Sequence, residues 1–336
     1  MNDLSRRSGW WLGILWVVLT VFKLWLAATA ELLPEEAYYW TYGQHPALSY
    51  FDHPPMVAWV INGGVWLAGT TELGVRLGFI LLSLGSAALL YDLARQWYDP
   101  RTALASAGLF VMIPLYAGTG LLAFPDGPLI FFWLLTLVTV TRALRSGRRG
   151  WWWAAGVALG GALLAKYTAI LLVPSLGLFL WFSPPHRHWL GRREPWLALV
   201  MAAAVFSPVV LWNAHHEWAS FLFQSHRTIG QTTHAWRTVP EFWLGQLAIL
   251  SPLVFAGLGW AAWRCMRQRT EAGGFALAFS LPLFAVFALA SFHTKIHVNW
   301  TAPAFLSLLP ALLSQALEHP AAPRPTGRRL AALTVI

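Results

Sequence analysis

The sequence predicts an all-α, polytopic membrane protein, and three observations lead to this class. Of the 336 residues, 57% are apolar. Only 11% are charged, whereas an average soluble protein is about one quarter charged. Mean hydropathy is +0.53. This composition excludes a soluble globular protein and a disordered chain, and the single cysteine, Cys265, excludes a disulfide framework or a cysteine-built metal site.

We read ten apolar runs as membrane spans, since a helix needs about 20 residues to cross the hydrocarbon layer. An eleventh run begins at residue 330. The first run ends in Ala28-Thr29-Ala30, as a cleavable signal peptide would, but its length and Lys23 favour an uncleaved helix. The ten predicted spans lie at about 9–30, 74–94, 102–121, 127–144, 151–165, 168–183, 196–212, 242–263, 274–292 and 300–317.

The net charge of +9 is explained by membrane orientation. If the N-terminus lies inside and the spans alternate, the inside loops hold 17 of the 23 Lys and Arg residues, and all 17 are arginine. Cytoplasmic loops of membrane proteins carry such an excess. No nucleic-acid partner is therefore expected.

Two long outer loops interrupt the predicted single transmembrane domain of residues 1–336. The first, 31–73, contains an apolar segment at 54–69 that is too short to span and is typical of a helix in the interface. The second is 213–241. The remaining six cations, eight of the 14 acids and eight of the 11 histidines lie at or near the outer side, which indicates a functional site at that boundary.

Two adjacent carboxylates, Glu35 and Glu36, follow the first span and precede Tyr38-Tyr39-Trp40. A carboxylate near the membrane surface is a candidate for accepting a proton from an attacking hydroxyl, since a low dielectric raises its pKa. A solvated helix start, with acids at the positive end of the helix dipole and an aromatic belt behind them, explains the pair equally well.

Two further acids lie in short outer segments. Asp52 lies beside His53, and two prolines follow. The Asp52 carboxylate would orient the His53 imidazole or bind a cation, although an Asx turn explains the pair nearly as well. Asp126 lies in a very short turn between apolar runs, where an acid is costly and functional by default. The alternative for Asp126 is a helix cap.

Cations occupy two tight outer turns. Lys166 interrupts a long apolar stretch, and Lys295 lies between His293 and His297. A fixed ammonium at headgroup depth suits a lipid phosphate, although snorkelling is the simpler alternative. The adjacent pair His215-His216 does not share a helix face, which disfavours zinc.

The sequence lacks a Walker A motif, a GxGxxG after a strand and a GxSxG motif. It also has no stretch suited to a soluble nucleotide-binding domain. ATP and sugar nucleotides from the inner side are therefore disfavoured as donors. Cations beside carboxylates at the outer face favour a lipid-linked phosphate donor.

In this combination of motifs, the chain resembles the C-type membrane glycosyltransferases that use lipid-phosphate sugars. These are the protein O-mannosyltransferase-like group and its bacterial relatives, which include the lipid A aminoarabinose transferase. The resemblance runs from about residue 10 to about residue 310, and all six motifs fall on the predicted outer side. The motifs are Glu35–Trp40, Ser49–Pro55, Pro125–Leu129, Ala165–Tyr167, Trp212–Trp218 with Gln224, and Lys295–Trp300.

The resemblance implies a C-type glycosyltransferase fold in a bacterial inner membrane. It implies transfer of a sugar from a polyprenyl phosphate to a lipid A, lipopolysaccharide, other cell-envelope glycan or protein acceptor at the periplasmic face, by inverting displacement. Glu35 takes the position of the family's key aspartate, and Asp126 matches its second acid; these are the expected catalytic residues. The residues expected to bind substrate or phosphate are Glu36, Tyr39, Asp52, His53, Arg76, Lys166, Tyr167, Lys295, His297 and Asn299.

Other expectations remain open at this point. Glu35 and Asp126 are the residues that would hold a divalent cation such as Mg²⁺ or Mn²⁺, as in some C-type relatives; no other cofactor is expected. Relatives commonly continue into a periplasmic C-terminal domain, which this chain is expected to lack. The competing functions are a polyprenyl-lipid flippase and a catalytically inactive paralogue, the latter because Glu35 replaces an aspartate.

Overall fold

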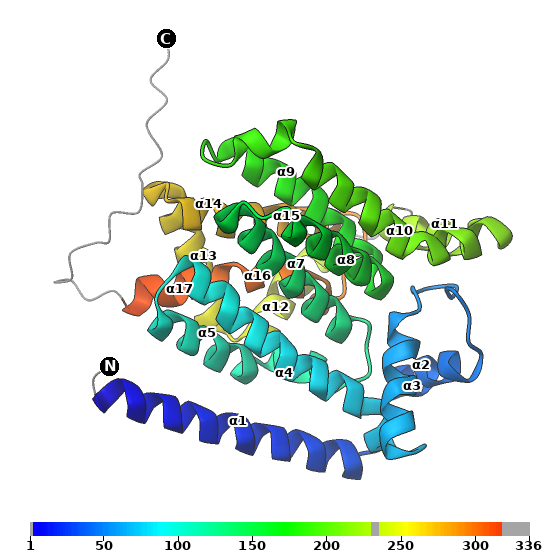
Figure 1. Ribbon diagram of the computed structural model, residues 1–336. Helices are drawn as coiled ribbons and strands as arrows, with labels where there is room; N and C mark the ends of the chain where they lie inside the picture. Colours follow the sequence, from blue (N-terminus) through cyan, green and yellow to red (C-terminus); the bar gives the residue numbers. More distant parts are fainter. Residues whose placement is uncertain (1–2, 230–234, 318–336) are drawn as a thin grey trace.

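The computed structural model describes residues 3–229 and 235–317, and within these ranges the chain is helical with no strand (Figure 1). Three short 3₁₀ segments interrupt the α-helices: η1 (Tyr167–Leu171), η2 (Arg187–Gly191) and η3 (Val298–Thr301). The helices are α1 (Asp3–Thr29), α2 (Pro34–Gln44), α3 (Met56–Ala68), α4 (Glu72–Trp97), α5 (Pro100–Met112), α6 (Pro114–Thr119), α7 (Asp126–Ser146), α8 (Gly150–Ala165), α9 (Leu172–Phe182), α10 (Arg193–His215), α11 (Ala219–Ile229), α12 (Ala235–Leu250), α13 (Pro252–Gln268), α14 (Glu271–Ala278), α15 (Leu281–Ala290), α16 (Ala302–Leu306) and α17 (Leu308–Leu317).

Local capping signals set several helix boundaries. The Thr71 side chain accepts a hydrogen bond from the Gly74 N–H at the start of α4, and Asp99 caps α5 in the same way. Helix α7 begins at Asp126 and ends at Gly147, which has φ +65°. A glycine adopts that left-handed conformation without the penalty that a Cβ would bring.

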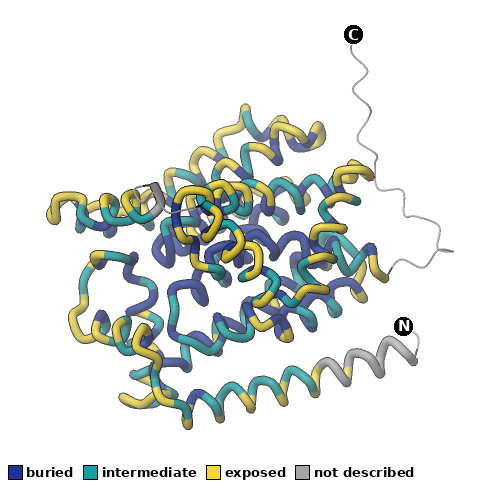
Figure 2. Tube along the Cα trace, turned by 180° about the vertical axis from the view of Figure 1, so that it is seen from behind, coloured by how far each residue is buried: buried dark blue, intermediate teal, exposed yellow. Residues whose placement is uncertain are grey.

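Helix α7 forms the centre of the bundle. It packs between α4 and α8, and α8 packs against α10. In the tube view of Figure 2, buried segments fill the middle of the molecule. Gly156 permits the close approach of α8 and α10, because a Cβ at that position would lie 2.4 Å from the Ala198 carbonyl oxygen. Helix α1 lies along one side of the bundle and contacts α4 and α5 (Figure 1).

The first predicted outer loop is folded. It contains α2 and α3, so the expectation of a helix within 54–69 is confirmed. Tyr42, Val57, Ile61 and Phe79 belong to a buried cluster that joins α2 and α3 to α4. Because of this packing, the first turn of α2 is held against the bundle. Part of the second predicted loop is also helical, as α11 and the start of α12.

The predicted span at 242–263 is wrong as a single helix. Helices α12 and α13 meet there at 103°, with Ser251 between them at φ +70°. The Ser251 hydroxyl accepts a bond from the Val254 N–H and Pro252 is the first residue of α13, so the sequence starts a new helix at this point. The predicted span at 300–317 is likewise bent, by 57°.

By length and composition, four of the described helices can cross a membrane, or seven if each bent pair counts as one span. The predicted ten or eleven spans exceed this number. The runs 151–165 and 168–183 form apolar helices of fewer than 18 residues, and the run 102–121 is broken at Pro114 between α5 and α6. The expected run from residue 330 lies outside the described residues.

Candidate functional site

Asp126, Lys166 and Asn299 form a buried polar cluster. Asp126 is the first residue of α7, Lys166 lies in extended backbone between α8 and η1, and Asn299 belongs to η3. The Lys166 ammonium is 2.9 Å from Asp126 Oδ1, and Asn299 Nδ2 donates to Asp126 Oδ2 at 2.8 Å. Asp126 is 2% exposed and Lys166 is 7% exposed. Three predicted site residues, far apart in the sequence, thus meet in space.

Two cations share one indole ring beside this cluster. The Lys166 ammonium is 5.7 Å from the centre of the Trp300 ring, and the Arg227 guanidinium is 5.2 Å from it. Arg227 also lies 2.9 Å from His297 Nε2. Sequence reasoning placed Arg227 on the outer side but did not include it among the site residues. Its position in the second long outer loop, close to Gln224, was the available signal.

His53 faces the same cations. It is 8% exposed and makes an edge contact with Tyr39, with 5.6 Å between ring centres. Burial, together with the charges of Lys166 and Arg227, lowers the pKa of His53 from 6.5 to about 3. Burial and the same two cations also lower the pKa of His297. The His53 imidazole is therefore neutral at pH 7.

Asp52 lies at the edge of the cluster. It accepts hydrogen bonds from the hydroxyls of Tyr42 and Tyr38, and its backbone carbonyl accepts one from Gln224 of α11. Burial raises the pKa of Asp52. The Gln224 bond joins the first outer loop to the second. Tyr167 makes a further link between segments, since its hydroxyl is 2.6 Å from Ser220 Oγ.

Glu36 and Arg76 form an internal ion pair. Arg76 Nη2 is 2.6 Å from Glu36 Oε2, and Arg76 Nε donates to Oε1 at 2.9 Å. Arg76 also donates to backbone carbonyls at the end of α1, and Glu36 accepts from the N–H groups of Leu33 and Ala123. Both side chains are almost fully buried. Their predicted contact with substrate or phosphate would require breaking these bonds, so their geometry instead favours a positioning role.

Glu35 and Lys295 lie apart from the cluster. Glu35 is exposed on the first turn of α2, and within the described residues it has no hydrogen bond or ion pair. Lys295 has a side chain 71% exposed, and its ammonium is 3.9 Å from Glu241 Oε2. The structure therefore does not join either residue to Asp126, and their predicted roles remain predictions.

The residues around Asp126 fit a divalent cation poorly. Both of its carboxylate oxygens already accept hydrogen bonds, and the Lys166 ammonium supplies the compensating positive charge. Within the part of the chain that the structure describes, no group of three or more His, Cys, Asp or Glu side chains is placed to hold a metal ion.

Comparison with known proteins finds a family model and relatives that resemble this chain. Residues 52–212 match the family model described as dolichyl-phosphate-mannose-protein mannosyltransferase. The chain is 26% identical to a lipid A galacturonosyltransferase, RgtD, of Rhizobium johnstonii, over 90% of this chain and 64% of that protein. It is 31% identical to an undecaprenyl phosphate-alpha-4-amino-4-deoxy-L-arabinose arabinosyl transferase of Pseudomonas fluorescens, over 83% of this chain and 53% of that protein. The chain thus spans about half to two thirds of the length of these relatives.

The fold matches solved structures of the same class. The structure of ArnT from Cupriavidus metallidurans in the apo state aligns with a TM-score of 0.71 and 22% identity, over 93% of this chain and 60% of that one. An oligosaccharyltransferase of Archaeoglobus fulgidus aligns with a TM-score of 0.55 and 14% identity, over 91% and 49% of the two chains. The molecule is an all-α membrane protein with the C-type fold. The chain is thus similar to C-type glycosyltransferases, by its fold and by the family model that matches residues 52–212.

Proposed function

We propose that the chain transfers a sugar from a polyprenyl-phosphate donor to an acceptor at the outer face of a bacterial inner membrane. The observation that carries this proposal is the pair of cations, Lys166 and Arg227, that flank one indole ring beside a buried carboxylate. Such a pair suits a phosphate leaving group, and one relative of the same fold was solved bound to undecaprenyl phosphate.

Lys166 neutralises the leaving phosphate in this scheme. An ammonium has three N–H donors, and one of those on Lys166 is directed at Asp126. The others remain for phosphate oxygens. As the bond between the anomeric carbon and the phosphate oxygen breaks, negative charge grows on the phosphate, and a preorganised cation stabilises it. The phosphate leaves without needing a proton from an acid.

The acceptor hydroxyl attacks the anomeric carbon from the opposite side, which inverts its configuration. Glu35 is the group that we assign to deprotonate or orient this hydroxyl, because its carboxylate is exposed and not engaged by the described residues. Its neighbour Glu36 bonds to the Ala123 N–H, so the turn that carries Glu35 is tied to the segment leading into Asp126. Asp126 orients Lys166 and Asn299 and does not serve as the base.

The expected acceptor is lipid A or another cell-envelope glycan. This rests on the relatives, one of which is named a lipid A galacturonosyltransferase. The periplasmic side is supported by charge. Asp126 begins α7, whereas Arg145, Arg148 and Arg149 lie at or just beyond its other end, as the positive-inside rule requires for the cytoplasmic face.

A transfer assay tests the proposal. Membranes with wild-type protein or with Lys166→Ala, Asp126→Asn or Glu35→Gln would receive radiolabelled polyprenyl-phosphate sugars, and label would be followed into lipid and protein. We expect wild-type transfer and a loss of about 10²- to 10³-fold for Lys166→Ala, as for removal of one oxyanion-stabilising group. Arg148→Ala, at an exposed cation beyond the opposite end of α7, is the matched control and should lose far less.

Two other results would count against the proposal. Absence of transfer from every donor, with the variants indistinguishable from wild type, would favour an inactive paralogue. Movement of labelled lipid across the membrane without transfer would favour a flippase. Full activity in Glu35→Gln alone would remove that residue from the mechanism and leave the phosphate-binding assignment intact.

A further inference from the structure

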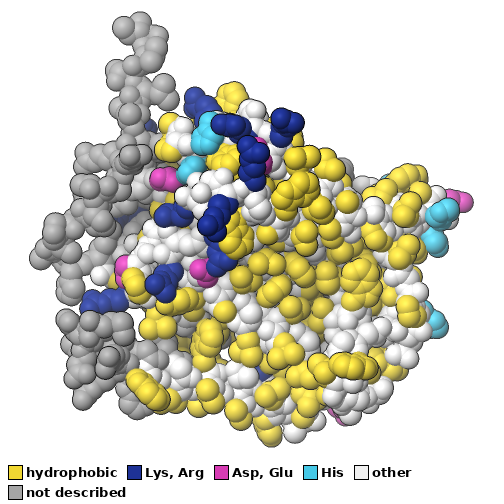
Figure 3. Space-filling view, in the orientation of Figure 1, with side chains coloured by type: hydrophobic (Ala, Val, Ile, Leu, Met, Phe, Trp, Pro, Cys, Tyr) yellow, Lys and Arg dark blue, Asp and Glu magenta, His cyan; other side chains and the backbone are white. Residues whose placement is uncertain are grey.

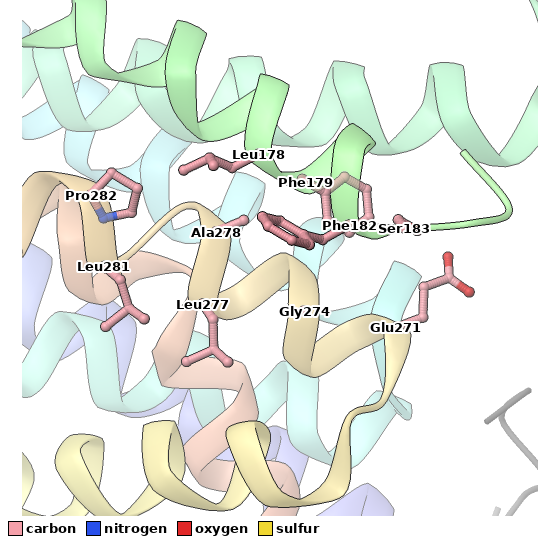
Figure 4. A pocket seen from close by; sticks show the side chains of 10 residues that line it. All are labelled: Leu178, Phe179, Phe182, Ser183, Glu271, Gly274, Leu277, Ala278, Leu281 and Pro282. Atoms are coloured by element: carbon pink, nitrogen blue, oxygen red, sulfur yellow. The ribbon is translucent and has the colours of Figure 1, made fainter. Parts of the chain in front are cut away.

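An apolar groove lies between α9 and the α14–α15 pair, remote from the site (Figure 4). Its volume is about 280 Å³, close to the lower size of pockets that hold small ligands, about 300 Å³. Phe182 is 68% exposed at its rim, so the groove opens at the side of the bundle. Its lining includes Leu178, Phe179, Phe182, Leu277, Leu281 and Pro282.

The groove lies in the inner half of the membrane. Its lining runs along the chain from Glu271 to Pro282, which corresponds to about 16 Å of helix, or roughly the depth of one leaflet. Glu271 follows the arginine-rich segment 264–269, which charge assigns to the inner side. Asp126 and Arg145 lie about 28 Å apart along α7. Because Arg145 interacts with Glu271 at the mouth of the groove, the groove is not part of the proposed phosphate site.

The inner end of the groove includes one unsatisfied polar atom, and a second lies on a neighbouring residue. Ser183, which lines it, has a buried hydroxyl with no hydrogen-bond partner among the described residues. His186 is 8% exposed; its Nε2 is 2.8 Å from Glu271 Oε1, while its buried Nδ1 has no partner within the same ranges. Buried polar groups of proteins are almost always hydrogen-bonded. The unpaired Ser183 hydroxyl, at the polar end of an apolar groove, indicates a bound molecule with polar atoms of its own.

The charge at this end is positive. Arg187 lies next to His186, with its guanidinium 5.9 Å from the Trp181 ring, and Arg145 packs on Trp97, which in turn contacts Phe179 of the groove. Arg145 also interacts with Glu271, the acid at the groove mouth. Figure 3 shows Lys and Arg side chains gathered on this part of the surface. Basic pockets between membrane helices on the cytoplasmic side suit anionic headgroups.

We infer that this groove binds an anionic phospholipid of the inner leaflet. One acyl chain would lie between α9 and α14–α15, the Ser183 hydroxyl would donate to an ester or phosphate oxygen, and Arg187 would pair with the headgroup. The inner position of the groove favours a bulk phospholipid over the sugar donor, whose phosphate belongs at the opposite membrane face. This inference does not depend on the transferase activity.

Gly274 offers a way to fill the groove. It lines the groove, and a Cβ at this position would meet no atom within 4 Å, so Gly274→Leu is expected to fold. Gly259 of α13 has the same open surroundings, and Gly259→Leu is the matched control. Each buried methylene strengthens lipid binding roughly fourfold, so displacing two of them weakens it by more than about tenfold.

The test is native mass spectrometry of the purified full chain with phosphatidylglycerol, phosphatidylcholine of the same acyl chains, or undecaprenyl phosphate. We expect wild type and Gly259→Leu to retain phosphatidylglycerol over phosphatidylcholine, Gly274→Leu to lose it, and Arg187→Gln to lose the preference. Equal retention by wild type and Gly274→Leu would overturn the inference. Equal binding of both phospholipids by wild type, or displacement of phosphatidylglycerol by undecaprenyl phosphate in wild type, would overturn it too.

Discussion

His53 shows how a single residue is fitted to a cationic site. A protonated imidazole next to Lys166 and Arg227 would add a third positive charge in a buried place, and the low pKa of about 3 avoids this. The ring instead offers an uncharged surface against Tyr39. A neutral His53 adds no positive charge beside Lys166 and Arg227, the two cations that we propose to bind the donor phosphate.

The pKa of His53 predicts an acid-dependent loss of stability. Its pKa in the folded protein lies below the ordinary 6.5, so the unfolded chain takes up the proton first as pH falls. The contribution of neutral His53 to the free energy of unfolding is full above pH 6.5. It is lost as pH falls from 6.5 toward 3, by at most about 1.4 kcal/mol per pH unit. When the pH falls from 7 to 5, we expect the melting temperature of His53→Gln to fall less than that of wild type.

The matched control is His45→Gln, at an exposed histidine of the same loop. It should leave the acid sensitivity of wild type unchanged. Melting curves of the purified protein in detergent, taken at several pH values, provide the measurement. Identical pH slopes for wild type and His53→Gln would contradict the assignment of a neutral, buried His53.

Residue identities were predictable here, but their orientations were not. Asp126, Lys166 and Asn299 each interrupt or border apolar sequence, and that expensive placement singled them out. Glu35 and Glu36 are adjacent, and neighbouring residues on a helix point about 100° apart. One of the two had to face the bundle, and only the packing of α2 decides that it is Glu36.

At the scale of elements, the buried Glu36–Arg76 ion pair connects the first outer loop to the bundle. It joins the first turn of α2, the end of α1, helix α4 and the segment before α7 through buried hydrogen bonds. Removing one partner of a buried ion pair leaves an uncompensated charge, which costs about 3–5 kcal/mol. We therefore expect Arg76→Met to lower the thermal unfolding temperature strongly.

A half-exposed ion pair provides the comparison. Arg142 and Asp92 join α7 to α4 at 2.6 Å, with side chains 40% and 34% exposed, and such pairs contribute about 0–1 kcal/mol. Arg142→Met should therefore change the unfolding temperature much less than Arg76→Met. The double variant Glu36→Gln with Arg76→Met should regain part of the loss, since no buried charge remains. Equal effects of Arg76→Met and Arg142→Met would show that the buried pair has no special role.

Helix positions followed from hydropathy, whereas helix breaks did not. The average apolarity of 242–263 is the same whether the chain runs straight or turns by 103° at Ser251. The signal was local: a Ser-Pro pair at the start of a new helix. Packing against α17 and α14 then fixes the direction of α13, and such long-range contacts are not present in a hydropathy profile.

For the whole molecule, one orientation in the membrane accounts for both the distribution of arginines and the position of the proposed site. The arginine-rich segments lie at or just beyond the ends of α7, α9 and α13, and the Asp126 cluster lies at the other end of α7. If the arginines lie inside, the proposed phosphate site and α11 lie outside. The inverse orientation would bring the proposed site to the cytoplasmic face, where the proposed periplasmic acceptor would be out of reach.

Cysteine labelling tests this orientation directly. In a Cys265→Ser background, Ser225→Cys on α11 and Ser146→Cys at the end of α7 each place one thiol at an exposed position. We expect a membrane-impermeant maleimide to label Ser225→Cys in intact spheroplasts and Ser146→Cys only after the membrane is opened. A permeant maleimide should label both and so show that both thiols are reactive. Labelling of Ser146→Cys alone from outside would invert the molecule and place the proposed phosphate site on the cytoplasmic side.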